Sequence, residues 1–339
     1  MSPQDRSTWR SPALGEARIL DLPGGRIGVH EAGSGPPIVF VHGLLVNANL
    51  WRKVVERLAP APGEERSRNV TGGAQLERRS GEHRTERSPA STAPEGFRCI
   101  ALDLPLGSHV VPAGAGADLT PPGLAGLIAQ ALDALELEDV TLVGNDTGGA
   151  LCQMLVTTRP ERVGRLVLTS CDYRDNFPPA AFRPLKVMAR IPGATQVVLS
   201  TMRPRAPRRL PVAFGWLTKR PIDRDAEDSY VYPAITARAV RADLRRTLPA
   251  IDPRHTRDAA ARLHTFDRPA LIAWAREDKF FPTEHAEELA AILPDSRLEW
   301  IDDSYTFSPE DQPARLSELI AGFVRGPAAL MSQSKPTPT

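Results

Sequence analysis

Six short apolar runs are spaced along the chain, and each is bounded by glycine or polar residues. They read IVFVHG (38–43), FRCIALD (97–103), VTLV (140–143), VGRLVLTS (163–170), RPALIAWARED (268–278) and SRLEWIDD (296–303). Runs without regular polar alternation are typical of strands buried on both faces of a parallel sheet. The pattern therefore predicts at least six strands in one sheet.

Segments with helical spacing separate these runs. Behind the helix-start signal LTPPG, apolar residues repeat every three or four positions, at Leu124, Leu127, Ile128, Ala131, Leu132 and Leu135. The stretches 48–60 and 284–293 are also predicted helices, and 17–33 predicts a hairpin around a Pro-Gly-Gly turn. Strands that alternate with helices indicate an α/β fold whose mostly parallel sheet is covered by helices on both faces.

Two segments interrupt this rhythm. Residues 61–95 mix charges with Gly, Ser, Thr and Pro and offer little to bury, so we expect a disordered insertion. Residues 173–263 lack strand runs and carry Pro- and Arg-rich helical segments, which predict an inserted helical cap. The α/β core is then expected in two parts, 14–172 and 264–325, followed by a disordered tail over 326–339.

Composition and charge narrow the possible partners. The formal net charge is +1 over 339 residues, whereas nucleic acids and acidic membranes require a concentrated positive field. The expected partner is a small-molecule substrate, with no nucleic acid and no membrane. Three cysteines without metal-ligand spacing and a start without a signal-peptide pattern predict a reduced, cytoplasmic protein with no metal and no cofactor.

The sharpest chemical signal is GNDTG, residues 144–148, directly after a predicted strand and before a predicted helix. Two glycines flanking one central residue have the spacing of a nucleophile elbow, in which the central side chain points out over the sheet edge. Asp146 would supply a carboxylate that needs no base to remove a proton. Its simpler role would be to cap the helix that begins at Thr147. The DTGG of an aspartic protease is disfavoured, because that fold pairs two such motifs and only one occurs here.

With these motifs in this order, the chain resembles the α/β-hydrolase fold superfamily, in the haloalkane dehalogenase and epoxide hydrolase branch that uses an Asp nucleophile. The resemblance implies a mostly parallel eight-stranded sheet. It also implies an oxyanion site formed by the backbone N–H groups of Leu44 and Thr147, with His42 structural, and Asp278 of AREDKFFP as the acid of the triad. Asp278 could instead only cap the helix that follows it.

The chain departs from this family pattern at the catalytic base. In the loop DDSYTFSPEDQP (302–313), alignment of Phe307 and the Gln-Pro pair places Thr306 where the family carries its histidine. Thr147 stands where haloalkane dehalogenases usually carry Trp. Tyr230 and Tyr232 could correspond to the ring-activating tyrosines of epoxide hydrolases, although packing or surface roles are the simpler interpretation.

A third carboxylate, Asp172, follows the strand at 163–170, near where some family members place their acid. If Asp146, Asp172 and Asp278 meet at one dry sheet edge, at least one pKa should rise, giving an acid that can donate a proton at neutral pH. Three functions stay open. They are a hydrolase with an atypical triad acting on a small apolar substrate, a non-hydrolytic lyase, isomerase or cyclase of secondary metabolism, and a degenerate ligand-binding protein.

Overall fold

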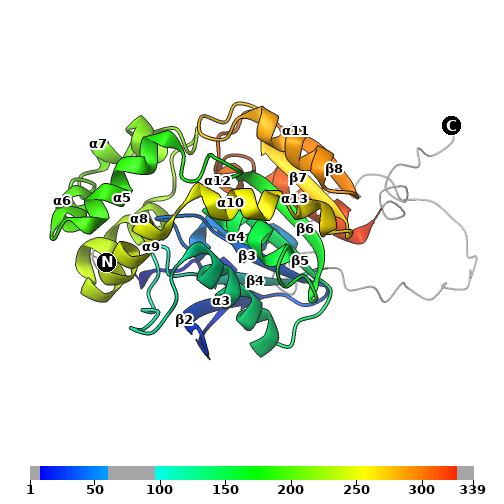
Figure 1. Cartoon of the computed structure of the whole chain (residues 1–339), viewed down its shortest axis with the longest axis horizontal. Coiled ribbons are helices and arrows are strands. Elements are labelled where there is room, and N and C mark those ends of the chain that lie inside the picture. The colour runs from blue at the N-terminus through cyan, green and yellow to red at the C-terminus, as the bar shows by residue number, and fades with distance from the viewer. Residues whose placement is uncertain (1–7, 60–95, 327–339) are drawn as a thin grey trace, which may run out of the picture.

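The computed structural model describes residues 8–59 and 96–326, so the insertion predicted at 61–95 and residues 327–339 of the tail predicted over 326–339 lie outside the described residues. One eight-stranded sheet runs through this part of the chain, in the order β1-β2-β4-β3-β5-β6-β7-β8 (Figure 1). The strands are β1 (Glu16–Leu22), β2 (Gly25–Ala32), β3 (Pro37–Val41), β4 (Arg98–Asp103), β5 (Val140–Asp146), β6 (Val163–Cys171), β7 (Ala270–Ala275) and β8 (Ser296–Ile301).

The direction of the strands follows the sequence prediction. β1 and β2 form the expected antiparallel hairpin, and β2 also pairs with β4 antiparallel. Every other neighbouring pair, from β4–β3 across to β7–β8, is parallel. The mostly parallel eight-stranded α/β sheet is therefore confirmed.

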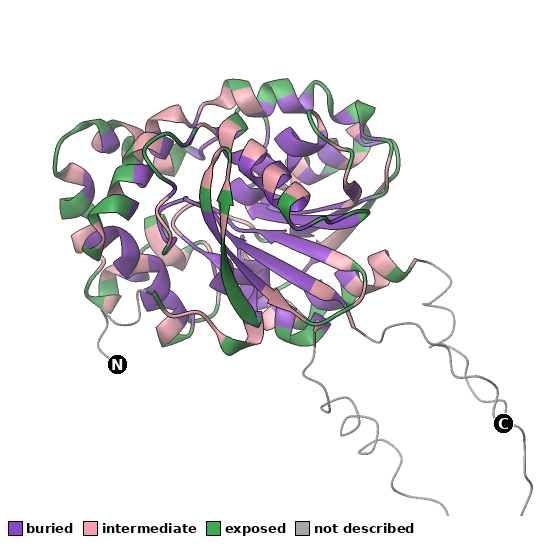
Figure 2. Ribbon diagram, turned by 90° about the horizontal axis from the view of Figure 1, so that it is seen from below, coloured by how far each residue is buried: buried purple, intermediate pink, exposed green. Residues whose placement is uncertain are grey.

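The two faces of the sheet bury separate apolar clusters, because successive side chains of a strand point to opposite faces. In β3, Val39 and Val41 belong to the cluster beneath α3 (Pro121–Ala134) and α4 (Thr147–Val156), whereas Ile38 and Phe40 belong to the cluster beneath α1 (Arg52–Leu58) and α13 (Pro313–Arg325). Figure 2 shows the inner strands buried between helices, with the edge hairpin partly exposed. This double burial explains why the strand sequences read as continuous apolar runs.

The helices of the core and of the segment between β6 and β7 are as follows. Those of the core are α1 (Arg52–Leu58), α3 (Pro121–Ala134), α4 (Thr147–Val156), α11 (Thr283–Ile292), α12 (Ser308–Asp311) and α13 (Pro313–Arg325). Between β6 and β7 lie α5 (Arg183–Arg190), α6 (Ala194–Ser200), α7 (Arg205–Arg208), α8 (Arg224–Thr236), α9 (Arg238–Ala250) and α10 (Pro253–Ala260).

Two helical segments differ from the sequence pattern. The stretch 48–60 starts as a 3-10 turn, Ala48–Trp51, before α1. Within the helical cap predicted over 173–263, residues 235–248 do not form one helix, because extended backbone at Ala237 separates α8 from α9. None of the described helices has both the length and the apolar character needed to cross a membrane.

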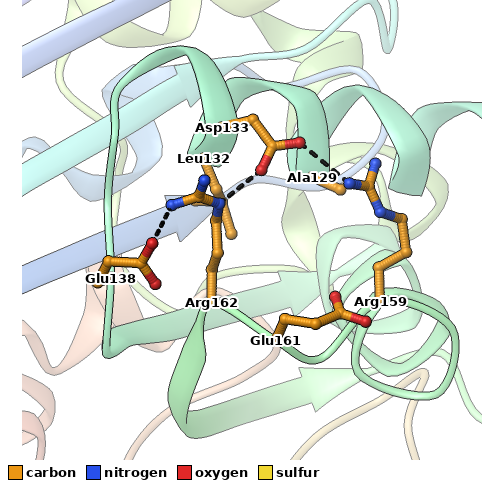
Figure 3. Close-up of a pocket in the computed structure, with 7 residues that line it drawn as sticks. All are labelled: Ala129, Leu132, Asp133, Glu138, Arg159, Glu161 and Arg162. Carbon is orange, nitrogen blue, oxygen red and sulfur yellow. Dashed lines mark hydrogen bonds and ion pairs between the residues drawn. The ribbon is translucent and has the colours of Figure 1, made fainter.

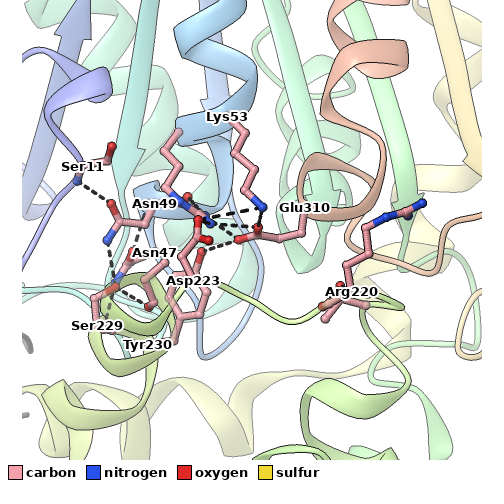
Figure 4. A network of polar contacts seen from close by, with 12 residues as sticks. Ser11, Asn47, Asn49, Lys53, Arg220, Asp223, Ser229, Tyr230 and Glu310 are labelled. Carbon is pink, nitrogen blue, oxygen red and sulfur yellow. Dashed lines mark hydrogen bonds and ion pairs between the residues drawn. The ribbon is translucent and has the colours of Figure 1, made fainter.

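A network of ion pairs and hydrogen bonds joins α1 both to α12 of the core and to the start of α8, in the segment between β6 and β7. Arg52 of α1 is 4% exposed and donates through Nη2 to Glu310 Oε2 at 3.0 Å, and it also pairs with Asp223 just before α8 (Figure 4). Lys53 Nζ lies 3.0 Å from the same Glu310 oxygen. Asn49 adds a bond to Ser229 Oγ of α8 at 2.8 Å. This network fixes α8 against α1 and against the loop after β8.

Replacing Arg52 with Met should lower the free energy of unfolding by about 3 kcal/mol, because Glu310 would stay buried with only Lys53 as a charged partner. Arg57→Met is the matched control, since Arg57 lies exposed on the same helix, and it should change stability by less than about 0.5 kcal/mol. Chemical denaturation of both variants measures the difference. Equal losses in the two variants would contradict the role given to the buried pair.

Candidate active site

The turn between β5 and α4 holds Asp146 in a strained backbone conformation, with φ 54° and ψ −132°. Non-glycine residues adopt positive φ only where the surrounding structure enforces it. A Cβ added at Gly148 would lie 2.3 Å from the carbonyl oxygen of Val41, and one added at Gly144 would lie 2.7 Å from Gly149 Cα. The glycines therefore allow α4 to approach β3 and β5 closely, as the sequence spacing predicts.

The Asp146 carboxylate contacts the loop after β3. Leu44 N donates to Oδ2 at 3.1 Å, and a Cβ at Gly43 would lie only 2.0 Å from that oxygen. Burial raises the pKa of Asp146 to about 7; the N–H groups of Thr147 and Leu44 oppose this rise, and the nearby Asp278 charge adds to it. Near neutral pH the group is thus poised between its acid and its nucleophilic form.

Asp278 lies beyond the end of β7 and contacts Thr306. Its Oδ1 accepts from Phe280 N at 2.8 Å, from Phe281 N at 2.9 Å and from the Thr306 hydroxyl at 3.0 Å. Burial raises the pKa of Asp278 to about 6, and these donors limit the rise. Asp278 does not cap the next helix, α11 (Thr283–Ile292), because its N-cap is Pro282 and no side chain caps it; Phe280 and Phe281 lie in the turn before that helix.

Asp172 is fully buried just after β6, beside the elbow. Thr147 Oγ1 lies 3.1 Å from Asp172 Oδ2, and Asp172 N donates to the Asp146 carbonyl at 3.4 Å. Burial and the Asp146 charge raise the pKa of Asp172 well above its usual range. The structure thus brings all three aspartates to the carboxyl edge of neighbouring strands, and no lysine or arginine is bonded to any of them among the described residues.

An apolar cavity of about 290 Å³ opens above the elbow. Leu44, Asp146 and Thr147 line its base, and Phe182, Leu199 and Phe214 are among the apolar residues that line it from the segment between β6 and β7. Asp172, Asp278 and Thr306 do not line it. Asp146 is therefore the only carboxylate among the described residues that faces this cavity.

Candidate bases and ring activators have other partners. His42 Nδ1 contacts Gly43 O at 2.8 Å and Nε2 accepts from Leu104 N at 3.0 Å, while burial lowers the pKa of His42 to about 4. No histidine of the described chain lines the cavity. Tyr230 lines it, but its hydroxyl bonds Glu310 at 3.4 Å; Tyr232 does not line it and packs under the Arg208 guanidinium.

Two polar side chains that sequence reasoning passed over hold the site together. Asn145 Nδ2 donates to the Thr306 carbonyl at 2.8 Å, which ties the elbow to the loop after β8. Gln153 Nε2 of α4 donates to the Asp172 carbonyl at 2.9 Å. The sequence did offer a signal for Asn145, which stands directly beside Asp146 at the end of an apolar strand. In the structure Asn145 is fully buried, and a buried amide needs hydrogen-bond partners.

A second surface depression, of about 340 Å³, is lined by residues of α3 and of the segments that precede β5 and β6 (Figure 3). Asp133 pairs there with Arg159 and Arg162, and Glu138 pairs with Arg162. Its charges neutralise one another, and it contains no strained residue or raised carboxyl pKa. The described residues also hold no group of three or more His, Cys, Asp or Glu side chains placed to bind a metal. The apolar cavity at Asp146 is the better candidate site.

Comparisons with known proteins agree with this architecture. A family profile described as the alpha/beta hydrolase fold matches residues 36–313. Haloalkane dehalogenase 2 of Mycobacterium tuberculosis is 26% identical over 312 residues, which cover 90% of this chain and 93% of that protein.

Solved structures are similar in fold. A variant of the haloalkane dehalogenase DatA from Agrobacterium tumefaciens superposes with a TM-score of 0.64 at 20% identity, covering 94% of this chain and 100% of that one. The epoxide hydrolase CorEH superposes with a TM-score of 0.67 at 16% identity, covering 91% and 98%.

The raised carboxyl pKa values predict a pH-dependent stability. Between pH 4 and 7 the folded state retains a proton on Asp146 that the unfolded chain releases near pH 3.8, so the free energy of unfolding falls as pH rises. Asp146→Asn removes this loss. The free energy of unfolding of Asp146→Asn, relative to that of the parent, should increase from pH 4 to pH 7 by at most about 1.4 kcal/mol per pH unit and level off above pH 7.

Denaturation curves from pH 4 to 8 test this expectation. Asp267→Asn, at an exposed position, is the control and should show a small, constant difference from the parent. An advantage of Asp146→Asn that is constant with pH would show that the carboxyl is not titrating in the folded state as described.

Proposed function

This chain belongs to the α/β hydrolase fold family, and we propose that it is a hydrolase in which Asp146 attacks a small apolar substrate such as a haloalkane or an epoxide. One observation carries the proposal. The Asp146 carboxylate stands on a strained turn at the base of an apolar cavity, with Oδ2 bonded to Leu44 N. The similarity to haloalkane dehalogenases and to an epoxide hydrolase supports this substrate class.

The first step uses the two carboxylate oxygens differently. Leu44 N holds Oδ2, so Oδ1 attacks the sp³ carbon of the substrate and forms an alkyl ester. The bond from that carbon to halide or epoxide oxygen breaks, and its electron pair leaves with the halide or oxygen. The N–H groups of Leu44 and Thr147 position the carboxylate before attack and bind the carbonyl oxygen of the ester afterwards.

Asp172 and Thr147 form a route for the proton that an epoxide oxygen needs. Burial and the Asp146 charge raise the pKa of Asp172 well above its usual range, which favours its protonated form, and Thr147 Oγ1 lies 3.1 Å from its Oδ2 while Thr147 also lines the cavity. The proton of Asp172 passes to Thr147 Oγ1 as the Thr147 hydroxyl proton passes to the leaving oxygen. Thr147 thus links a buried acid to a cavity that the acid does not itself reach.

The second step, cleavage of the ester by water, is the slow one in this proposal. Thr306 bonds Asp278 as a histidine base would, but a hydroxyl does not accept a proton from water near neutral pH. General-base catalysis contributes roughly a hundred- to ten-thousandfold. Without that contribution the alkyl ester on Asp146 should be long-lived.

A second function is favoured by the same carboxyl groups. Three aspartates have raised pKa values and no nitrogen base lines the cavity among the described residues, which suits a non-hydrolytic lyase, isomerase or cyclase with Asp146 as acid or base. Such an enzyme would turn over its substrate without a covalent intermediate. Detection of an ester therefore separates the two functions.

Incubation with a small primary haloalkane should leave one alkyl group on the peptide that contains Asp146, detected by mass spectrometry. Only the ionised carboxylate attacks, so the rate of labelling should rise roughly a hundredfold from pH 5 to pH 9, with a midpoint near 7. Asp146→Asn should not be labelled, whereas Asp133→Asn should react like the parent. Labelling at another carboxylate would contradict Asp146 as the nucleophile.

Thr306→His should convert this stable ester into turnover, with hydrolysis faster by roughly a hundredfold or more, because histidine beside Asp278 supplies the missing base. Overpacking at this buried position costs about 1–3 kcal/mol, so folding is checked first by circular dichroism. Thr306→Val is the matched control: it keeps the volume, adds no base, and should leave the ester in place. If a folded Thr306→His enzyme hydrolyses no faster than Thr306→Val, the long-lived ester does not result from the absent histidine.

A further inference from the structure

Positive charge is concentrated in one part of the segment between β6 and β7. Residues 176–222 contain nine lysines and arginines and no aspartate or glutamate, in a chain whose formal net charge is only +1. The nine are Arg183, Lys186, Arg190, Arg203, Arg205, Arg208, Arg209, Lys219 and Arg220. We call residues 176–222 the basic cap segment.

About half of these charges are neutralised by neighbours. Arg205 and Arg208 pair with Glu227 and Asp228 of α8. Lys219 and Arg220 pair with Asp303 after β8. The other five, Arg183, Lys186, Arg190, Arg203 and Arg209, form no ion pair with the described residues, and four of them are exposed. The segment therefore presents an outward positive field.

Exposed apolar side chains gather on the same segment. Nine large apolar side chains are exposed in the described chain, and seven of them belong to the basic cap segment. The seven are Val187, Ile191, Val197, Val198, Leu210, Val212 and Trp216. Val197 is 67% exposed and Trp216 is 44% exposed. Apolar groups grouped in this way mark an interaction surface, whereas single exposed apolar residues do not.

This surface is continuous with the candidate active site. Val198 and Val212 are exposed and also line the apolar cavity above Asp146. Trp216 contacts Phe280, which in turn contacts Phe182 of the cavity wall. Figure 1 shows α5, α6 and α7 together at one end of the molecule, away from the strands. A partner bound here would lie at the entrance of the cavity.

We propose that the basic cap segment docks on an anionic lipid surface, with its apolar side chains in the headgroup region and its free cations against the lipid charges. Segments that combine lysine and arginine with exposed apolar and Trp side chains bind such interfaces without spanning them. A second copy of this chain would place like charges against one another, which disfavours self-association through this face. Docking would let the cavity take apolar substrate directly from the bilayer, and that part alone rests on the proposed function.

This proposal departs from the sequence-based expectation of no membrane partner. That expectation used the net charge of the whole chain, in which acidic residues elsewhere offset the nine cations of one segment. Electrostatic attraction decays within about 8 Å at physiological ionic strength, so a lipid surface responds to the charges nearest to it.

Vesicle binding without substrate tests the docking, so the result does not depend on any catalytic activity. The full chain is mixed with vesicles of phosphatidylcholine alone or with added phosphatidylglycerol, at low and high salt, and bound protein is separated by flotation. Binding should require phosphatidylglycerol and weaken as salt rises. Equal binding to both vesicle types, or no binding to either, would overturn the proposal.

Two matched variants locate the contact. Arg183→Glu/Arg203→Glu should weaken binding roughly thirtyfold or more, since each cation at a lipid surface contributes about fivefold. Arg57→Glu/Arg262→Glu makes the same change in net charge at exposed positions outside the segment and should bind nearly as the parent does. Equal weakening would show that only total charge matters and would overturn the assignment to this surface.

Trp216 reports on the contact directly. Its fluorescence should shift to the blue on binding, and Trp216→Phe should bind equally while losing that shift. If the shift persists in Trp216→Phe, another face is docking. Sedimentation without lipid completes the test, because dimerisation abolished by Arg183→Glu/Arg203→Glu would assign the surface to a second copy instead.

Discussion

The positive φ of Asp146 is the constraint on which the site depends. A residue held at φ 54° between β5 and α4 points its side chain out of the sheet edge and toward the loop after β3. That geometry requires the backbones of the loop after β3 and of the start of α4 to pack closely. A side chain at Gly43 would overlap Asp146, and one at Gly148 would overlap the Val41 carbonyl. The packing of β3, β5 and α4 therefore serves first to place one carboxylate.

Three carboxyl groups are buried at this edge of the sheet without a bonded cation among the described residues, and this burial sets the chemistry of the site. Backbone N–H groups hold Asp146 and Asp278, and Thr147, whose hydroxyl bonds Asp172, also lines the cavity. Such donors offset only part of the desolvation cost, so protons are retained to higher pH than in water. The same burial that makes the site reactive makes the fold less stable toward alkaline pH.

The segment between β6 and β7 combines two surfaces in one short stretch. Its inner side closes an apolar cavity over Asp146, and its outer side exposes apolar groups among cations that form no ion pair with the described residues. The Arg52–Asp223 pair at the start of α8 and the Asn49–Ser229 bond anchor α8 to the core. The cavity and its entrance surface thus share apolar side chains, and the entrance surface alone adds positive charge.

The apolar runs and the helical spacing in the sequence determined the sheet, because strands buried on both faces appear in the sequence as continuous apolar runs. Gly144 and Gly148 also indicated the sharp turn at Asp146, since only small residues allow so close a crossing. Three features came only from the tertiary structure. They are the contact of Thr306 with Asp278, the bond from Asn145 to the loop after β8, and the exposure of the apolar groups among the cations. Each depends on segments far apart in the chain. Burial and the approach of distant neighbours set pKa values and exposed surface, and no local pattern encodes either.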